Sequence, residues 1–118
     1  MKTRTDYTCP LELTHDIIRG KWKPIILWQL GKGKTSLSNL QNSITGIGQK
    51  MLLQHLDELK TFGMVQKKQY EGYPLRVEYS LTEKGTRMLN VIAAMQEIGI
   101  ELMKEDGKED FLREKGLI

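Results

Sequence analysis

Cysteine, histidine and long hydrophobic runs are scarce in this chain. Its 118 residues include one cysteine and two histidines. One cysteine excludes an intramolecular disulfide and a cysteine-based zinc site, and neither histidine belongs to a cluster with metal-ligand spacing. No apolar run approaches the roughly 18 residues that a membrane span needs, and the N-terminus lacks the apolar stretch of a signal peptide. We therefore expect a cytoplasmic protein without a metal or cofactor.

Catalytic motifs are missing as well. There is no glycine-rich phosphate loop and no pair of carboxylates at a plausible site. Cys9 and His15 are a conceivable nucleophile and base, but six helical residues turn through about 600°, which places the two on different faces. We therefore expect no enzymatic activity and keep a thiol enzyme that uses Cys9 as an alternative only.

The composition indicates one globular domain that spans residues 1–118. Charge is unevenly distributed along it. Residues 19–76 carry 10 basic and 3 acidic side chains, a net charge of +7, whereas residues 77–118 carry 6 and 9, a net charge of −3. A basic middle segment favours a surface for a polyanion. Lysines that merely solubilise the surface are the alternative.

Four helices are predicted in the first half of the chain, over about 9–19, 24–30, 38–43 and 49–62. Pro10 and Pro24 suit first helical positions, because the N–H that proline lacks would be unpaired there. Ser38, with Gln41 three residues later, fits a capping box. The second helix is apolar almost all round and is expected to lie at the centre of the core.

A β-hairpin and two further helices are predicted in the second half. Strands over Val65–Tyr70 and Arg76–Leu81 flank a turn at residues 71–74, and the second strand alternates apolar and polar side chains. A long helix is predicted over about 83–104, and a short polar helix over about 108–115. Helices followed by a basic hairpin are typical of the winged helix-turn-helix, a mainly α fold with a small β-hairpin wing.

An apolar stripe along the long helix exceeds what so small a core can cover. We therefore expect a second subunit to cover it, with packing inside the same chain as the alternative. The winged-helix core is assigned to about 9–85 and the dimerisation helices to about 9–19 and 83–115. The residues assigned to the dimer interface are Met88, Ile92, Met95, Ile98 and Leu102.

The fourth helix has two different faces. At 100° per residue, its core side carries Leu52, Leu56 and Leu59. The opposite side carries Lys50, Gln54 and Asp57, flanked by Gln49 and Leu53. Lysine and glutamine on an exposed helix are side chains that bind phosphates and base edges. An ordinary solvated helix face is the alternative.

Several short segments, in this order, resemble the HxlR-type transcription regulators, which are related to the MarR group. The resemblance covers about residues 9 to 105 and implies a homodimeric winged-helix protein that binds double-stranded DNA. The segments that carry it are Cys9-Pro10, Gly20-Lys21-Trp22-Lys23, Gly46-Ile47, Gln49-Lys50-Met51-Leu52, Leu56-Asp57-Glu58-Leu59, Gly63, and Pro74-Leu75-Arg76-Val77-Glu78-Tyr79-Ser80-Leu81-Thr82-Glu83-Lys84-Gly85.

A set of DNA contacts follows from this reading. We expect Gln49, Lys50 and Gln54 in the major groove, with His55 at its edge. Phosphate contacts are assigned to the wing and to helix starts, and Ser36 and His55 stand where relatives often carry basic residues. A winged-helix protein–protein interaction module is the alternative function. The predicted phosphate contacts are Lys23, Ser36, Ser38, Lys67, Lys68 and Arg76.

Cys9 is the candidate regulatory residue. It precedes the first helix, and the positive end of a helix dipole favours a thiolate. The resemblance implies an electrophile or oxidant sensor, because several relatives use the matching cysteine in this way. A small-molecule effector is the other candidate signal. The alternative is a buried cysteine that packs at the dimer interface.

Overall fold

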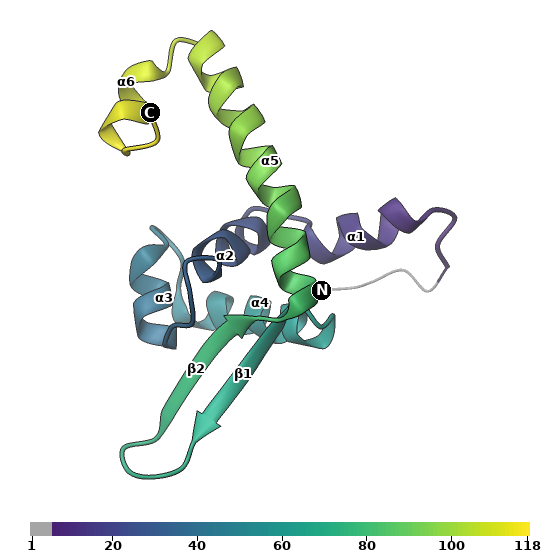
Figure 1. Cartoon of the computed structure of the whole chain (residues 1–118), viewed down its shortest axis with the longest axis vertical. Coiled ribbons are helices and arrows are strands. Elements are labelled where there is room, and N and C mark those ends of the chain that lie inside the picture. The colour runs from purple at the N-terminus through teal and green to yellow at the C-terminus, as the bar shows by residue number, and fades with distance from the viewer. Residues whose placement is uncertain (1–5) are drawn as a thin grey trace.

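The computed structural model describes residues 6–118 as a helical body from which a β-hairpin and one long helix project (Figure 1). Both strands begin and end at their predicted residues, and each predicted helix is present. The elements in chain order are α1 (Pro10–Ile18), α2 (Trp22–Leu30), α3 (Leu37–Ser43), α4 (Gln49–Thr61), β1 (Val65–Tyr70), β2 (Arg76–Leu81), α5 (Glu83–Glu105) and α6 (Glu109–Glu114).

Two helix starts differ from the prediction. α2 begins at Trp22, so Pro24 is its third residue, where the missing N–H still belongs to the unpaired first turn. α3 begins at Leu37 and is capped by Ser36, whose Oγ accepts a hydrogen bond from the Asn39 N–H at 3.1 Å. The capping box assigned to Ser38 is therefore wrong, and Ser38 is an exposed residue inside the helix.

The core is built around α2, as its apolar sequence predicted. Ile26 and Leu27 are completely buried, and α2 contacts α1, α3, α4, α5 and β2. The inner side of α4 contributes Leu52, Leu56 and Leu59, which confirms the periodicity of this helix. The largest hydrophobic side chains of the body thus hold α2, α3 and α4 in a fixed arrangement.

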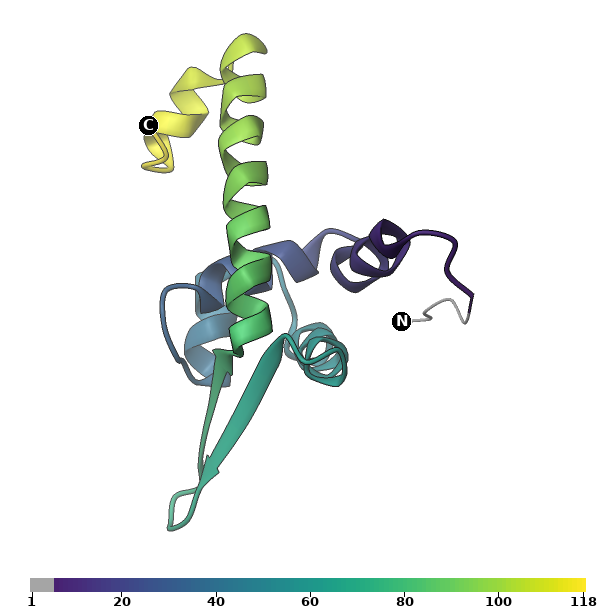
Figure 2. The same ribbon diagram turned by 45° about the vertical axis from the view of Figure 1, so that its right-hand side comes forward.

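The apolar stripe of α5 is divided between two environments. Met88 and Ile92 are buried against the chain's own core, so their assignment to a dimer interface is wrong. Beyond them the helix leaves the body (Figures 1 and 2), and Met95, Ile98 and Leu102 remain 49%, 56% and 58% exposed. This outer half of the stripe lacks a cover within the described residues, as does Val91, which is 52% exposed.

The start of α5 is in backbone contact with the segment that follows α4. A Cβ added at Gly85 would lie 2.0 Å from the Met64 carbonyl oxygen, so no side chain fits there. The Thr82 N–H donates to the same oxygen at 3.0 Å, and the Thr82 hydroxyl donates to the Gly63 carbonyl. α5 is therefore fixed directly to the end of α4.

A short bridge joins the hairpin to the body. Thr35, between α2 and α3, exchanges two backbone hydrogen bonds with Tyr79 of β2, at 3.0 and 2.8 Å. No pattern in the sequence predicts this third, one-residue strand. It holds the base of the hairpin in place next to α3.

Within residues 6–118, no helix is both long and apolar enough to cross a membrane.

Candidate nucleic-acid interface

The outer face of α4 presents polar side chains to solvent. Gln49, Lys50 and Gln54 are exposed, as is Asp57. The Gln54 side chain makes one long hydrogen bond, from Nε2 to Glu58 Oε1 at 3.4 Å, which leaves its amide available to a further partner. The predicted division of α4 into a buried and an exposed face is confirmed.

The turn between α3 and α4 is held by two buried plugs. Ile44 and Ile47 are 4% and 6% exposed, and they surround Gly46, which has a φ of +90°. That backbone conformation strongly favours glycine. The Trp22 ring lies 3.7 Å from the position of a Gly46 Cβ, so the turn is packed against the start of α2. α3, this turn and α4 form a helix-turn-helix in which α4 is the exposed second helix.

The hairpin places its basic residues on two opposite faces. Lys67 pairs with Tyr79, and Lys68 pairs with Glu78 on the next position of the ladder. Since side chains alternate across a strand, Lys67 lies on the side of the buried Tyr79 and Lys68 on the outer side. Both lysines were predicted to contact phosphates, and the structure places them on opposite faces of the hairpin.

The outer face of the hairpin carries a network around Tyr70. Lys68 Nζ and the Arg76 guanidinium lie 4.9 and 4.2 Å from the centre of the Tyr70 ring. The Tyr70 hydroxyl donates to Glu78 at 3.1 Å. Glu78 also pairs with Arg76 at 3.7 Å and with Lys34 at 3.9 Å. Sequence analysis missed Lys34, Tyr70 and Glu78. For Tyr70 and Glu78, the spacing of two from Lys68 and Arg76 along their strands was a usable signal.

Lys23 does not belong to this exposed surface. Its side chain is 4% exposed and its Nζ lies 2.6 Å from Glu58 Oε2 on α4. A buried ammonium that is already paired is not available to a phosphate, so the predicted phosphate contact of Lys23 is corrected to an internal ion pair. Glu58, which sequence analysis had no reason to single out, is its partner.

His55 also lies deeper than predicted. Its side chain is 16% exposed, and Nδ1 is 3.9 Å from Glu58 Oε2. Burial lowers the pKa of His55, and the nearby Lys23 ammonium lowers it further, against the opposing effect of Glu58. A mostly buried imidazole with a lowered pKa does not fit the assigned place at the edge of the exposed face.

Cys9 lies at the N-cap of α1 and is exposed in the single chain. His15 stands on the exposed side of the same helix, and its nearest acidic partner is Asp16 at 3.8 Å. Across residues 6–118, no group of three histidine, cysteine or acidic side chains could hold a metal ion.

A helix-turn-helix with an exposed second helix and a basic hairpin behind it defines a winged-helix transcriptional regulator. The family model described as "HxlR-like helix-turn-helix" matches residues 17–107, and the chain belongs to this family. The resemblance seen in the sequence is thereby confirmed.

Known relatives agree with this placement. The uncharacterised HTH-type transcriptional regulator YdeP of Bacillus subtilis is 42% identical over 91 residues, which cover 77% of this chain and 71% of that protein. The redox regulator HypR in its reduced form is similar with a TM-score of 0.77 and 35% identity, over 86% of this chain and 99% of HypR. Diamide-treated YodB from B. subtilis is similar with a TM-score of 0.69 and 30% identity, over 81% of this chain and 96% of YodB.

Proposed function

We propose that this transcriptional regulator acts as a homodimer that binds double-stranded DNA in a sequence-specific manner. The observation that carries the proposal is the common location of α4 and the hairpin, which both lie on the side of the body away from the free end of α5 (Figure 1). The exposed face of α4 has the width and the side chains to enter a major groove.

Different residues have different tasks in this proposal. Gln49, Lys50 and Gln54 on α4 read base edges, and the wing and the α3 region hold phosphates. The hairpin is suited to contact DNA phosphates, because each of its faces carries a lysine or an arginine. Lys23 and His55 are not among the proposed DNA contacts, because their side chains are mostly buried. The proposed phosphate contacts are Ser36, Ser38, Lys67, Lys68 and Arg76.

Two substitutions separate base reading from phosphate binding. Gln54→Ala should relax base preference by about 1–3 kcal/mol at one position of the site, as expected for loss of a bidentate contact. Lys67→Ala should weaken binding to all duplexes alike and reduce the slope of log K against log salt by about one. Duplexes selected from a random pool, and titrated at several salt concentrations, provide the measurement.

The same experiment tests the alternative function. A winged helix that binds proteins does not need a basic hairpin and should show little salt-dependent affinity for duplex DNA. An affinity that is unchanged between low and physiological salt would support the interaction module. If Gln54→Ala weakened binding to all duplexes alike and Lys67→Ala relaxed base preference, the assignment of base reading to α4 and of phosphate binding to the hairpin would be wrong.

We further propose that Cys9 makes DNA binding sensitive to thiol reagents. Its thiol is exposed at the start of α1, one of the two helices assigned to the dimer. The relatives HypR, a redox regulator, and YodB, whose structure was obtained after diamide treatment, support the proposal. Because the chain has one cysteine, the product must be an adduct, a mixed disulfide or a bond to the partner's cysteine.

Treatment with diamide or a quinone should therefore change the affinity for the selected duplex, and Cys9→Ser should abolish the response while basal binding persists. Modification at the dimer contact would alter the spacing of two α4 helices that must reach half-sites about 34–36 Å apart. Mass spectrometry of the native protein supplies the decisive control. If it finds neither an adduct nor a cross-linked dimer, Cys9 is a packing residue.

A further inference from the structure

The outer face of the hairpin, the side that carries Lys68, combines three cations with one aromatic ring and one carboxylate. Tyr70 and Arg76 stand opposite each other in the ladder, and Lys68 stands opposite Glu78. Because side chains alternate across a strand, all four side chains lie on this face. Lys34, from the segment between α2 and α3, reaches the same face through its ion pair with Glu78.

The Tyr70 ring lies at the centre of this group. Its side chain is half-buried, whereas the side chain of Arg76 is 65% exposed. The Arg76 guanidinium and the Lys68 ammonium are both within the distance of a cation–π interaction with the ring. The ring is itself anchored by its hydroxyl, which donates to Glu78 Oε2. One fixed ring therefore restricts two long side chains that are otherwise exposed to solvent.

The ion pair of Arg76 is formed along one edge of its guanidinium. Arg76 Nε lies 3.7 Å from Glu78 Oε1, and Arg76 forms no other ion pair within residues 6–118. A guanidinium has five N–H donors, of which four are on the two terminal nitrogens. These terminal groups remain available for a bidentate contact with a phosphate.

We propose that Tyr70 is a positioning residue for DNA binding, which holds the Arg76 guanidinium and the Lys68 ammonium ready for phosphates of the DNA backbone. This role rests on the proposed function, in which the two cations hold phosphates. A long basic side chain loses rotamer freedom when it binds, and a ring that already restricts it reduces that loss. Lys67 is different, because it lies on the opposite face and forms no cation–π contact among the described residues.

A set of combined variants tests the role, with the affinity for the selected duplex as the measurement. Tyr70→Val removes the ring but keeps a side chain that favours strands, and it should weaken binding by about threefold to tenfold. Tyr70→Phe keeps the ring and should bind nearly as tightly as the unmodified chain. In a chain that carries Lys68→Met and Arg76→Met, Tyr70→Val should have no further effect. In a Lys67→Met chain, its full effect should remain.

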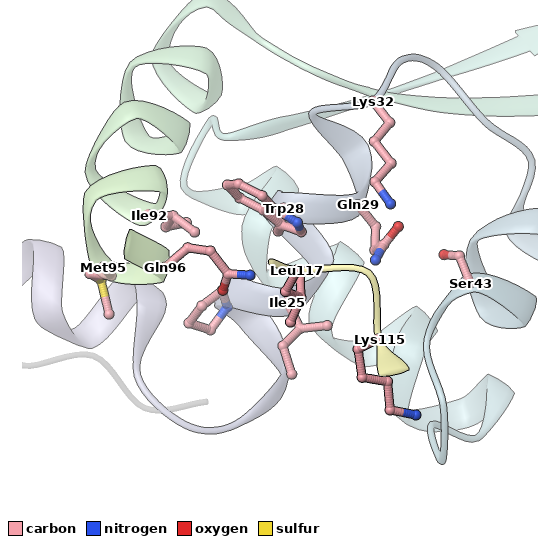
Figure 3. A pocket seen from close by; sticks show the side chains of 11 residues that line it. Ile25, Trp28, Gln29, Lys32, Ser43, Ile92, Met95, Gln96, Lys115 and Leu117 are labelled. Atoms are coloured by element: carbon pink, nitrogen blue, oxygen red, sulfur yellow. The ribbon is translucent and has the colours of Figure 1, made fainter. Parts of the chain in front are cut away.

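The two indole N–H signals in a ¹⁵N NMR spectrum show whether the body of each variant is unchanged. Trp22 packs against the turn of the helix-turn-helix. Trp28 lines a cavity between α2 and α5 that shares no residue with the hairpin (Figure 3). Both signals should therefore keep their positions in every variant.

Two results would overturn the positioning role while leaving the proposed function in place. One is a Tyr70→Val chain that binds as tightly as the unmodified chain. The other is an equal loss from Tyr70→Val in the chain with Lys68→Met and Arg76→Met, because the ring would then act through the structure of the hairpin rather than through the two cations.

The proposed function of this face has a separate criterion. The chain with Lys68→Met and Arg76→Met should bind all duplexes more weakly and show a slope of log K against log salt that is reduced by about two. If it binds as tightly as the unmodified chain, this face of the hairpin holds no phosphates, and the positioning role is overturned with it.

Discussion

Replacing Glu58 by leucine should lower the free energy of unfolding by about 3–5 kcal/mol, because it leaves the Lys23 ammonium buried without its carboxylate. The pair is 2.6 Å apart, with side chains only 4% and 15% exposed. Urea unfolding at a fixed protein concentration measures the loss. The double variant Lys23→Met with Glu58→Leu should recover most of it, since two apolar side chains can fill the same space.

An exposed ion pair provides the matched control. Lys34 lies 3.9 Å from Glu78 with 71% of its side chain exposed. Lys34→Met should therefore cost only about 0–1 kcal/mol. A Glu58→Leu variant as stable as Lys34→Met would show that the internal pair does not fix α2 against α4.

The pair also makes the fold sensitive to acid. Burial alone would raise the pKa of Glu58, but the hydrogen bond and charge of Lys23, together with further groups that include the Gln54 amide, lower the pKa from 4.5 to about 2. The unfolded chain then binds more protons, so this contribution is complete above pH 4.5 and is lost as the pH falls toward 2. The difference between these two pKa values corresponds to about 3 kcal/mol in the free energy of unfolding. Glu58→Gln should lose less stability than the unmodified chain across this interval.

Features that follow from the periodicity of a helix or strand were predicted correctly from the sequence. The spacing of Leu52, Leu56 and Leu59 placed the buried side of α4, and the alternation of apolar and polar side chains supported the second strand, β2. The same alternation would have separated Lys67 from Lys68, had it been applied to β1. These features depend on neighbours along the chain, which the sequence displays directly.

Other errors arose where distant segments decide the outcome. Lys23 has the sequence context of a helix-start cation, and only the packing of α2 on α4 reveals that Glu58 is its partner. Ser36 and Ser38 are both credible caps, and the choice follows from the extended backbone at Ser36, which has a ψ of 162°. The single stripe of α5 gave no sign of where the body ends, so Met88 and Ile92 could not be distinguished from Met95.

That boundary on α5 makes Met95 the position for testing the proposed dimer. Its side chain is 49% exposed in the single chain and lies in the outer stripe with Ile98 and Leu102. Met95→Glu should produce a monomer of 13.6 kDa, because association would bury an unpaired carboxylate. Light scattering measures the mass, and the effect should be close to complete at micromolar concentration.

Asn90→Glu is the matched control, because it adds the same charge to the exposed polar side of α5. It should retain the mass of the unmodified protein. Circular dichroism of the Met95→Glu variant should still show a folded chain, since the core contacts of α5 are made by Met88 and Ile92 rather than by Met95. A folded Met95→Glu protein with twice the single-chain mass would place the dimer contact elsewhere. The spacing of the two α4 helices would then have to be set by another surface, and α1, with Leu11 75% exposed, is the next one to test.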